Sequence, residues 1–202
     1  MTTTRLILAS TSPRRRQMLS DAGVPHRAFS PGIDDGPLRP GCVKPEQWVA
    51  ALAYLKARAG MERLETSERA TALVLGADTV VVKGDTLVGQ PRDAEDARAI
   101  IRRLRRGRHR VVTGVALLRD GARTLFHDTA TVEVGDIPDE RIEAYLTSGT
   151  WKGKAGAYNL AERTADGWPL QCTGDPTTVM GLPMRRLLPE LAALGVVAEA
   201  LP

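Results

Sequence analysis

The apolar residues of this chain fall into two patterns, short continuous runs and longer stretches in which they recur every three or four positions. Continuous runs are typical of buried strands, and spaced stretches are typical of helices that bury one face. The continuous runs predict strands at residues 6–9, 73–82 and 111–118, and a further strand is predicted at 124–134, which together with 111–118 flanks the turn Asp120-Gly121 as an antiparallel hairpin. The spaced stretches predict helices that begin at or just after Pro13, Pro45, Asp93, Pro138 and Pro183.

The strongest strand pattern, residues 73–82, contains one ionisable side chain, Asp78. An unpaired carboxylate is costly to bury, so Asp78 must meet a cation, a metal ion or a hydrogen-bond network, or emerge at a cleft. The alternative is an aspartate at a strand end that accepts hydrogen bonds from backbone amides. In the first case Asp78 is a candidate for chemistry, and in the second it is structural.

The first strand runs into a basic turn, in which a Ser-Pro step precedes three consecutive arginines, Arg14, Arg15 and Arg16. Ser12 suits the N-cap of a helix, and Pro13 suits its first position, where no amide hydrogen is needed. Cations in a first turn are disfavoured by up to about 1 kcal/mol each, because a helix start carries partial positive charge. Free amides and guanidinium groups at one place would suit a polyphosphate. The alternative is a solvated basic turn.

Basic side chains recur at two further places. Lys56 falls on the apolar stripe of the helix that begins at Pro45, four residues after Leu52. A lysine there either extends to water or reaches into a cleft between lobes. Six arginines lie between residues 102 and 110 and predict a solvated helix face and loop, with a phosphate or partner surface as the alternative.

A glycine-rich segment, residues 151–158, carries two lysines, Lys152 and Lys154. It is not a phosphate-binding Walker motif, because Ser148 stands where that motif needs glycine and Ala155 replaces the required hydroxyl residue. This spacing argues against a P-loop kinase or ATPase.

Length and composition limit the class of protein. With 202 residues, of which 43% are hydrophobic, the chain can bury a sizeable core as one domain or as two closely joined lobes with a cleft between them. No run has membrane-spanning length and no secretory signal is recognisable, so we expect a cytoplasmic protein without a membrane partner.

Cys42 and Cys172 lack metal-ligand spacing, which argues against zinc. The net charge of +4 favours anionic partners, whereas an aromatic content of 4% argues against nucleic acid.

Together these residues suit the metal-assisted hydrolysis of phosphate esters. In this chemistry carboxylates, here Asp34, Asp35 and Asp78, bind a divalent metal ion or activate water, and basic side chains bind the phosphates. Five segments carry a more specific pattern, namely 8–15 (LASTSPRR), 76–80 (GADTV), 109–115 (HRVVTGV), 151–158 (WKGKAGAY) and 181–183 (GLP). In this order, and over nearly the whole chain, they closely resemble the Maf family.

The Maf resemblance implies a single domain over residues 1–202 with an α/β fold, in which an elongated mixed sheet is flanked by helices as in the inosine triphosphatase architecture. It also implies a cytoplasmic nucleoside triphosphate pyrophosphatase, linked to septum formation and able to form a homodimer. The expected reaction is attack at the α-phosphate of a nucleoside triphosphate, which releases pyrophosphate and a nucleoside monophosphate. A divalent metal cation, Mg²⁺ or Mn²⁺, is expected to assist.

The resemblance also assigns roles position by position. Asp78 matches the proton acceptor that activates water, and Arg14 and Thr79 match positions of substrate recognition. Ser12, Arg15 and Lys56 match other positions of the same pocket. The remaining candidates are Gln90 and Lys154 as substrate ligands and Asp35 as the metal ligand.

Three departures from the family pattern bear on function. Asp35 stands where glutamate is usual, so the metal carboxylate is one methylene shorter, and Gln90 replaces a lysine, which predicts weaker binding of the triphosphate. Ala161 replaces the glutamine of the subgroup selective for dTTP and UTP, and alanine cannot hydrogen-bond a base. No pyrimidine preference is therefore predicted. Whether Glu162, at the next position, takes over part of the hydrogen bonding to the base stays open. Within enzymes, the alternative is a variant with altered base choice, such as a purine or modified nucleotide. From other classes, the alternatives are a catalytically weak nucleotide-binding or division-linked regulatory protein and, third, a nucleic-acid binder.

Overall fold

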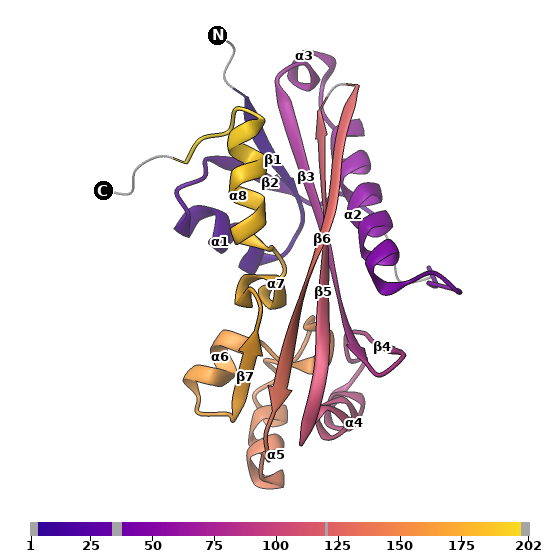
Figure 1. Ribbon diagram of the computed structural model, residues 1–202, viewed down its shortest axis with the longest axis vertical. Coiled ribbons are helices and arrows are strands. Elements are labelled where there is room, and N and C mark those ends of the chain that lie inside the picture. Colours follow the sequence, from indigo (N-terminus) through magenta and orange to yellow (C-terminus); the bar gives the residue numbers. More distant parts are fainter. Residues whose placement is uncertain (1–3, 34–37, 120, 199–202) are drawn as a thin grey trace. The chain divides into compact units, whose positions relative to one another are not determined.

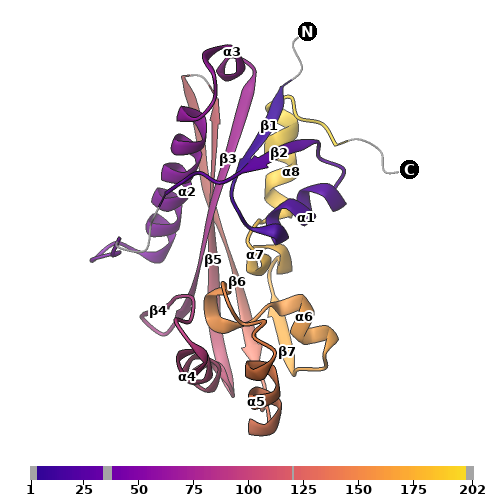
Figure 2. The ribbon, with the colours of Figure 1, turned by 180° about the vertical axis from the view of Figure 1, so that it is seen from behind.

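The computed structural model describes residues 4–33, 38–119 and 121–198 (Figures 1 and 2). In these ranges seven strands form one sheet in the order β2-β1-β3-β5-β6-β7, with β4 paired to β3. The strands are β1 (Arg5–Ala9), β2 (His26–Phe29), β3 (Ala72–Lys83), β4 (Thr86–Val88), β5 (Gly107–Arg119), β6 (Ala122–Val134) and β7 (Leu170–Thr173). β1 pairs in parallel with β2 and β3, whereas the β3–β4 and β6–β7 pairs are antiparallel. The predicted mixed sheet is therefore confirmed.

Helices flank this sheet, and the five predicted ones are present. The helices are α1 (Pro13–Asp21), α2 (Pro45–Glu62), α3 (Thr66–Arg69), α4 (Ala94–Leu104), α5 (Asp139–Thr147), the 3₁₀ helix η1 (Ala155–Ala157), α6 (Leu160–Ala165), α7 (Pro176–Met180) and α8 (Met184–Ala193). Over the described ranges, none of them combines the length and the apolar character needed to cross a bilayer.

The chain divides into two compact units, and three strands, β3, β5 and β6, contribute residues to both. The first unit comprises Met1–Asp78, Thr113–Asp128 and Gly181–Pro202. The second unit comprises Thr79–Val112 and Thr129–Met180.

In the first unit, alternate residues of β1 face opposite sides of the sheet, as the two-residue period of a strand requires. Leu6 and Leu8 join one hydrophobic cluster with residues of α1 and α8, and Ile7 and Ala9 join another with residues of α2. Figures 1 and 2 accordingly show α1 and α8 on one face and α2 on the other. Burial on both faces explains why these strands are continuously apolar in sequence.

The second unit has a core of its own, built on α4, α5 and the aromatic side chains of residues 145–168. α4 begins where predicted, because the carboxylate of Asp93 caps it by accepting from the Asp96 amide at 2.8 Å. Its predicted apolar face, with Ala97, Ile101 and Leu104, is buried.

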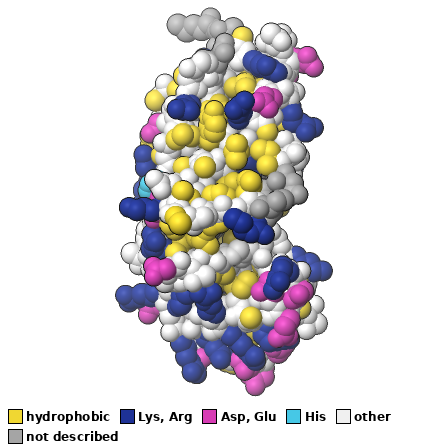
Figure 3. Space-filling view, turned by 90° about the vertical axis from the view of Figure 1, so that its right-hand side faces the viewer, with side chains coloured by type: hydrophobic (Ala, Val, Ile, Leu, Met, Phe, Trp, Pro, Cys, Tyr) yellow, Lys and Arg dark blue, Asp and Glu magenta, His cyan; other side chains and the backbone are white. Residues whose placement is uncertain are grey.

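The arginine-rich segment after α4 is matched by acidic side chains of the same unit. Arg105 pairs with Asp139 at 2.6 Å, and Arg108 pairs with Glu133 at 2.7 Å. Figure 3 shows basic and acidic side chains intermingled at the lower end of the face it presents. Exposed pairs of this kind contribute about 1 kcal/mol or less each. The segment is solvated, as predicted, and four of its six arginines pair with carboxylates of the same unit, which weakens the alternative of a phosphate-binding surface.

Candidate functional site

The turn between β1 and α1 is shaped by hydrogen bonds from its own side chains. As predicted, Ser12 is the N-cap of α1 and its Oγ accepts from the Arg15 amide at 3.5 Å. Ser10 Oγ accepts from the Ser12 amide at 3.2 Å and from Nη1 of Arg15 at 3.3 Å. Arg15 Nε also donates to the Gly181 carbonyl oxygen at 2.9 Å. The turn therefore has a defined conformation that Arg15 ties to the segment before α8.

Arg14 differs from Arg15 in its contacts. Its side chain is half-buried, and its guanidinium forms no hydrogen bond or ion pair with any residue in the part of the chain that the structure describes. No acidic residue lies in the first turn of α1, so nothing in that turn offsets the positive charge of the helix start. A half-buried guanidinium in this position suits an anionic ligand.

Helix α2 lies very close to the sheet at two glycines. A Cβ atom at Gly76 would lie 2.3 Å from the carbonyl oxygen of Ala53 and 2.6 Å from the amide nitrogen of Ala57. A Cβ atom at Gly114 would lie 2.5 Å from the Val49 carbonyl. Only glycine permits this approach of helix to strand, which brings Lys56, the neighbour of Ala57, against β3.

Lys56 and Asp78 form the ion pair that this approach makes possible. Lys56 Nζ lies 2.6 Å from Asp78 Oδ1, and the side chains are only 17% and 12% exposed. Lys56 therefore does not extend to water, and Asp78 lies within β3 rather than at a strand end. The sequence left open whether Asp78 pairs with a cation or caps a strand end. The structure shows that it pairs with a cation, the ammonium of Lys56.

The basic turn and the acid lie at the same end of neighbouring parallel strands. β1 and β3 run side by side up to the pair Leu8–Leu75. Beyond that pair β1 ends at Ala9 and the basic turn begins, whereas β3 continues past Asp78 to Lys83. The register therefore places the end of β1, where the turn begins, level with the part of β3 just before Asp78. Ligands of α/β sheets commonly bind beyond the carboxyl ends of parallel strands.

The second unit holds another lysine–carboxylate pair, within the glycine-rich segment and the helix that follows it. Lys154 is buried, and its ammonium donates to the carboxylate of Glu162 on α6. The side chain of Lys154 is 10% exposed and that of Glu162 is 44% exposed. Asn159 caps α6 by accepting from the Glu162 amide at 3.1 Å, as is typical of asparagine at a helix start. The direction of Glu162, left open by the sequence, is therefore toward Lys154.

A buried polar pair, His109 and Tyr158, was not predicted from the sequence. His109 on β5 is 3% exposed, and its Nε2 lies 2.9 Å from the hydroxyl of Tyr158. Among the described residues, no group hydrogen-bonds its Nδ1. Burial, and to a smaller extent the charge of Lys83, lowers the pKa of His109 to about 4, so the imidazole is neutral at neutral pH. The available signal was alternation, because His109 shares the inward face of its strand with Val111.

The remaining predicted residues lie in the second unit or outside the described residues. Thr79 is the first residue of the second unit and is half-buried, and Gln90 is exposed just after β4. Asp34 and Asp35, the carboxylates predicted near a metal, lie outside the described residues. Within the described ranges, no three His, Cys, Asp or Glu side chains come together as a metal cluster would require.

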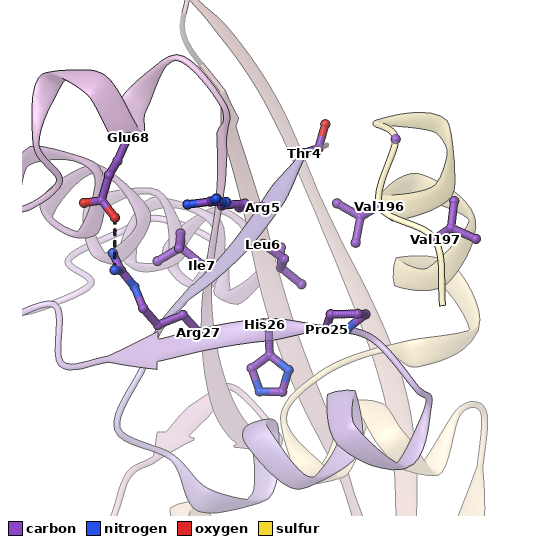
Figure 4. A pocket seen from close by; sticks show the side chains of 11 residues that line it. Thr4, Arg5, Leu6, Ile7, Pro25, His26, Arg27, Glu68, Val196 and Val197 are labelled. Atoms are coloured by element: carbon purple, nitrogen blue, oxygen red, sulfur yellow. Dashed lines mark ion pairs between the residues drawn. The ribbon is translucent and has the colours of Figure 1, made fainter. Parts of the chain in front are cut away.

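A cavity of about 460 Å³ lies elsewhere in the first unit, at the start of β1 and β2 (Figure 4). Leu6, Val196 and Val197 contribute apolar surface, and Arg27 at its rim pairs with Glu68 at 3.0 Å. None of the predicted site residues lines this cavity. It is therefore separate from the basic turn and from the Lys56–Asp78 pair.

A mixed sheet flanked by helices, with a basic helix start after β1 and a lysine-paired aspartate in β3, defines an α/β protein. The chain belongs to the Maf-like protein family, whose model matches residues 5–194, and this confirms the resemblance found in its motifs.

Three relatives share most of their length with this chain, and each is named a dTTP/UTP pyrophosphatase. The Geobacillus sp. protein is 38% identical, over 95% of this chain and 98% of the relative. The Salinibacter ruber protein is 41% identical, over 93% and 90%, and the Pelotomaculum thermopropionicum protein is 37% identical, over 94% and 96%. Among solved structures, the Staphylococcus aureus Ham1 protein aligns with 66% of this chain and 73% of its own, at 15% identity and a TM-score of 0.42.

Proposed function

We propose that this protein is a nucleoside triphosphate pyrophosphatase that hydrolyses its substrate to a nucleoside monophosphate and pyrophosphate. Family membership and relatives named dTTP/UTP pyrophosphatase support this activity. The structural observation that carries the proposal is the Lys56–Asp78 pair, held at 2.6 Å on β3, the strand next to the one that runs into the basic start of α1. It combines a base with the cations that a polyphosphate requires.

In the proposed reaction, water attacks the α-phosphorus and the bond from that phosphorus to the oxygen bridging to the β-phosphate breaks. Asp78 accepts a proton from the attacking water, as a general base. The ammonium of Lys56 stabilises the ionised carboxylate, which is the form that can accept this proton. Arg14 and Arg15, with Ser12 at the helix start, bind phosphate oxygens. In the second unit, Thr79, Gln90 and Lys154 are the proposed further substrate ligands.

A divalent cation belongs to this proposal. Mg²⁺ prefers oxygen ligands and is commonly held by one or two carboxylates together with substrate phosphates. Asp35 is the proposed protein ligand. When bound, the ion would neutralise phosphate charge and polarise the phosphoryl oxygens.

Two observations point in different directions on the base that the protein prefers. The relatives' names favour dTTP and UTP. Ala161, however, offers no hydrogen bond at the position that the family resemblance ties to base selection, and sites that hydrogen-bond a substrate discriminate far better than sites that only fit its shape. A homodimer and a cytoplasmic location likewise stay predictions.

The test is an assay of the purified protein with dTTP, UTP, CTP, ATP and GTP in the presence of Mg²⁺ or Mn²⁺. We expect equal amounts of pyrophosphate and nucleoside monophosphate, and no product after EDTA treatment. Asp78→Asn should lower kcat by about 10²–10⁴-fold, the usual contribution of a general base. Nucleotide binding without turnover by the wild type would instead support the regulatory alternative, and release of inorganic phosphate in place of pyrophosphate would contradict the proposed bond cleavage.

A further inference from the structure

The Lys154–Glu162 pair is asymmetric in its burial. The lysine side chain is 10% exposed, so its ammonium is largely removed from water, whereas the glutamate side chain is 44% exposed. Within the described part of the chain, the Glu162 carboxylate is the only group that accepts a hydrogen bond from this ammonium. A buried cation without a partner would be costly, so Glu162 supplies the negative charge that Lys154 needs when no ligand is present.

The backbone that carries Lys154 is fixed by buried hydrogen bonds. The Tyr145 hydroxyl donates to the Ala157 carbonyl oxygen at 3.0 Å, and the Gly156 amide donates to the Gly89 carbonyl oxygen at 3.1 Å. Gly156 and Ala157 have φ angles of 73° and 64°, a left-handed conformation that these bonds hold in place. The backbone next to Lys154 is therefore held in place, and of the two paired side chains it is the more exposed one, that of Glu162, that can turn into water.

We propose that Glu162 is an internal anion that occupies Lys154 until a phosphate group of the substrate replaces it, and that Glu162 thereby limits the affinity of the protein for phosphate. This inference rests on the proposed function, and specifically on Lys154 as a phosphate ligand. The exchange needs only a rotation of the glutamate side chain into water. A phosphate dianion can take its place, because it offers the ammonium at least as much negative charge and several acceptor oxygens.

The exchange has a measurable consequence. Each phosphate ligand that reaches Lys154 must first displace a charge-assisted hydrogen bond, so removing the negative charge of Glu162 should strengthen binding. For Glu162→Gln, which keeps the shape of the side chain, we expect the KM of the nucleotide and the Kd of inorganic pyrophosphate to fall about threefold to tenfold. The value of kcat should not rise, because Glu162 does not take part in bond cleavage.

The experiment measures KM and kcat with the best nucleotide of the wild-type protein, and the Kd of inorganic pyrophosphate with Mg²⁺ by calorimetry. Glu143→Gln is the matched control, since Glu143 pairs with Arg98 at 2.6 Å on another helix of the same unit. This control also loses one carboxylate and one ion pair, and it should leave KM and Kd unchanged. Glu162→Ala replaces Glu162→Gln in the same measurements if the latter does not fold.

Each other outcome overturns the inference. An unchanged or increased Kd for pyrophosphate in folded Glu162→Gln means that Glu162 does not compete with phosphate. A lower KM with an unchanged pyrophosphate Kd means that Lys154 contacts another part of the nucleotide. Equal improvement in Glu143→Gln means that net charge, not the position of Glu162, is responsible. If the wild type hydrolyses no nucleotide, the proposed function fails, while the pyrophosphate measurement still decides on Glu162.

Discussion

Two lysine–carboxylate pairs, one in each unit, differ in the surroundings of the carboxylate rather than of the lysine. Lys56 and Lys154 have side chains that are 17% and 10% exposed, so both ammonium groups are largely buried. Their partners differ, because the Asp78 side chain is 12% exposed and the Glu162 side chain is 44% exposed. Asp78 also lies within a long strand of the sheet, whereas Glu162 lies in the first turn of a short helix.

This difference separates a permanent pair from an exchangeable one. The Asp78 carboxylate is nearly buried and lies 2.6 Å from a similarly buried ammonium, so its partner is fixed by the packing of α2 on β3. Glu162 can turn to water with its side chain alone. Buried ion pairs are strongly destabilising to break because one charge is left unpaired, whereas a half-exposed partner recovers hydration. The stability of variants in the two pairs should therefore differ.

The largest effect is expected for Lys56→Met, which removes the ammonium that lies 2.6 Å from the nearly buried Asp78 carboxylate. We expect the free energy of unfolding to fall by about 3 kcal/mol, the lower end of the range for broken buried pairs. Urea unfolding followed by circular dichroism measures this. Arg58→Met on the same helix is the control, because its pair with Glu62 is exposed, and its stability should stay close to that of the wild type.

The double variant Lys56→Met with Asp78→Asn sharpens this prediction. Asparagine carries no charge, so the double variant should regain at least about 1 kcal/mol of the stability that Lys56→Met loses. If the double variant is no more stable than Lys56→Met, the loss comes from packing of the lysine stem and not from an unpaired carboxylate.

The next effect concerns the contact that brings Lys56 to Asp78. Gly76→Ala would place a Cβ atom 2.3 Å from the Ala53 carbonyl oxygen, so α2 or β3 must shift. Overpacking of this kind costs about 1–3 kcal/mol, and we expect a loss of about 2 kcal/mol together with reduced kcat. Gly89→Ala is the control, because no atom lies within 4 Å of a Cβ atom there. Wild-type stability and kcat in Gly76→Ala would show that the close approach is not required.

An effect of similar size on stability is expected for the buried His109, whose Nε2 hydrogen-bonds with the Tyr158 hydroxyl. The pKa of His109 is lowered by burial from 6.5 to about 4. Because the folded state disfavours the proton, the stabilisation is complete above pH 6.5 and is lost as pH falls from there toward 4. Linkage gives a loss of about 2 kcal/mol between pH 7 and pH 5.

His109→Gln should lack this part of the acid destabilisation. Urea unfolding of both proteins at the two pH values isolates it, because carboxylates that titrate in the same range, such as Glu143 with its lowered pKa beside Arg98, are common to both. Equal losses in the two proteins would mean that His109 protonates as easily in the folded state as in the unfolded one.

The same comparison shows what the sequence could predict of the fold. β3 and α2 were predicted because a long apolar run and a regular apolar stripe are strong local signals. The segment from residue 160 to residue 180 was not assigned, although it forms α6, β7 and α7. Each of these elements has six residues or fewer, which is too short for either period to emerge.

For the site, the sequence could predict chemistry but not partners. The acid in a buried strand, Asp78, needed a polar or charged partner, and Lys56 was unusual on the apolar stripe of its helix. Both residues were therefore predicted as site residues. That they meet each other depends on Gly76, whose lack of a side chain allows the approach of α2. The Lys154–Glu162 and His109–Tyr158 contacts were not predicted, because each joins residues whose proximity depends on the fold of the whole segment.

The smallest effect on stability is expected for Lys154→Met, which leaves Glu162 without its cation but able to reach water. We expect a loss of about 1 kcal/mol or less, against about 3 kcal/mol for Lys56→Met. The KM of the nucleotide should nevertheless rise about tenfold, because a charged hydrogen bond to phosphate is lost. Urea unfolding and steady-state kinetics on the two variants give both values. A stability loss as large as that of Lys56→Met would mean that Glu162 is held as firmly as Asp78, and the distinction between a permanent and an exchangeable pair would then fail.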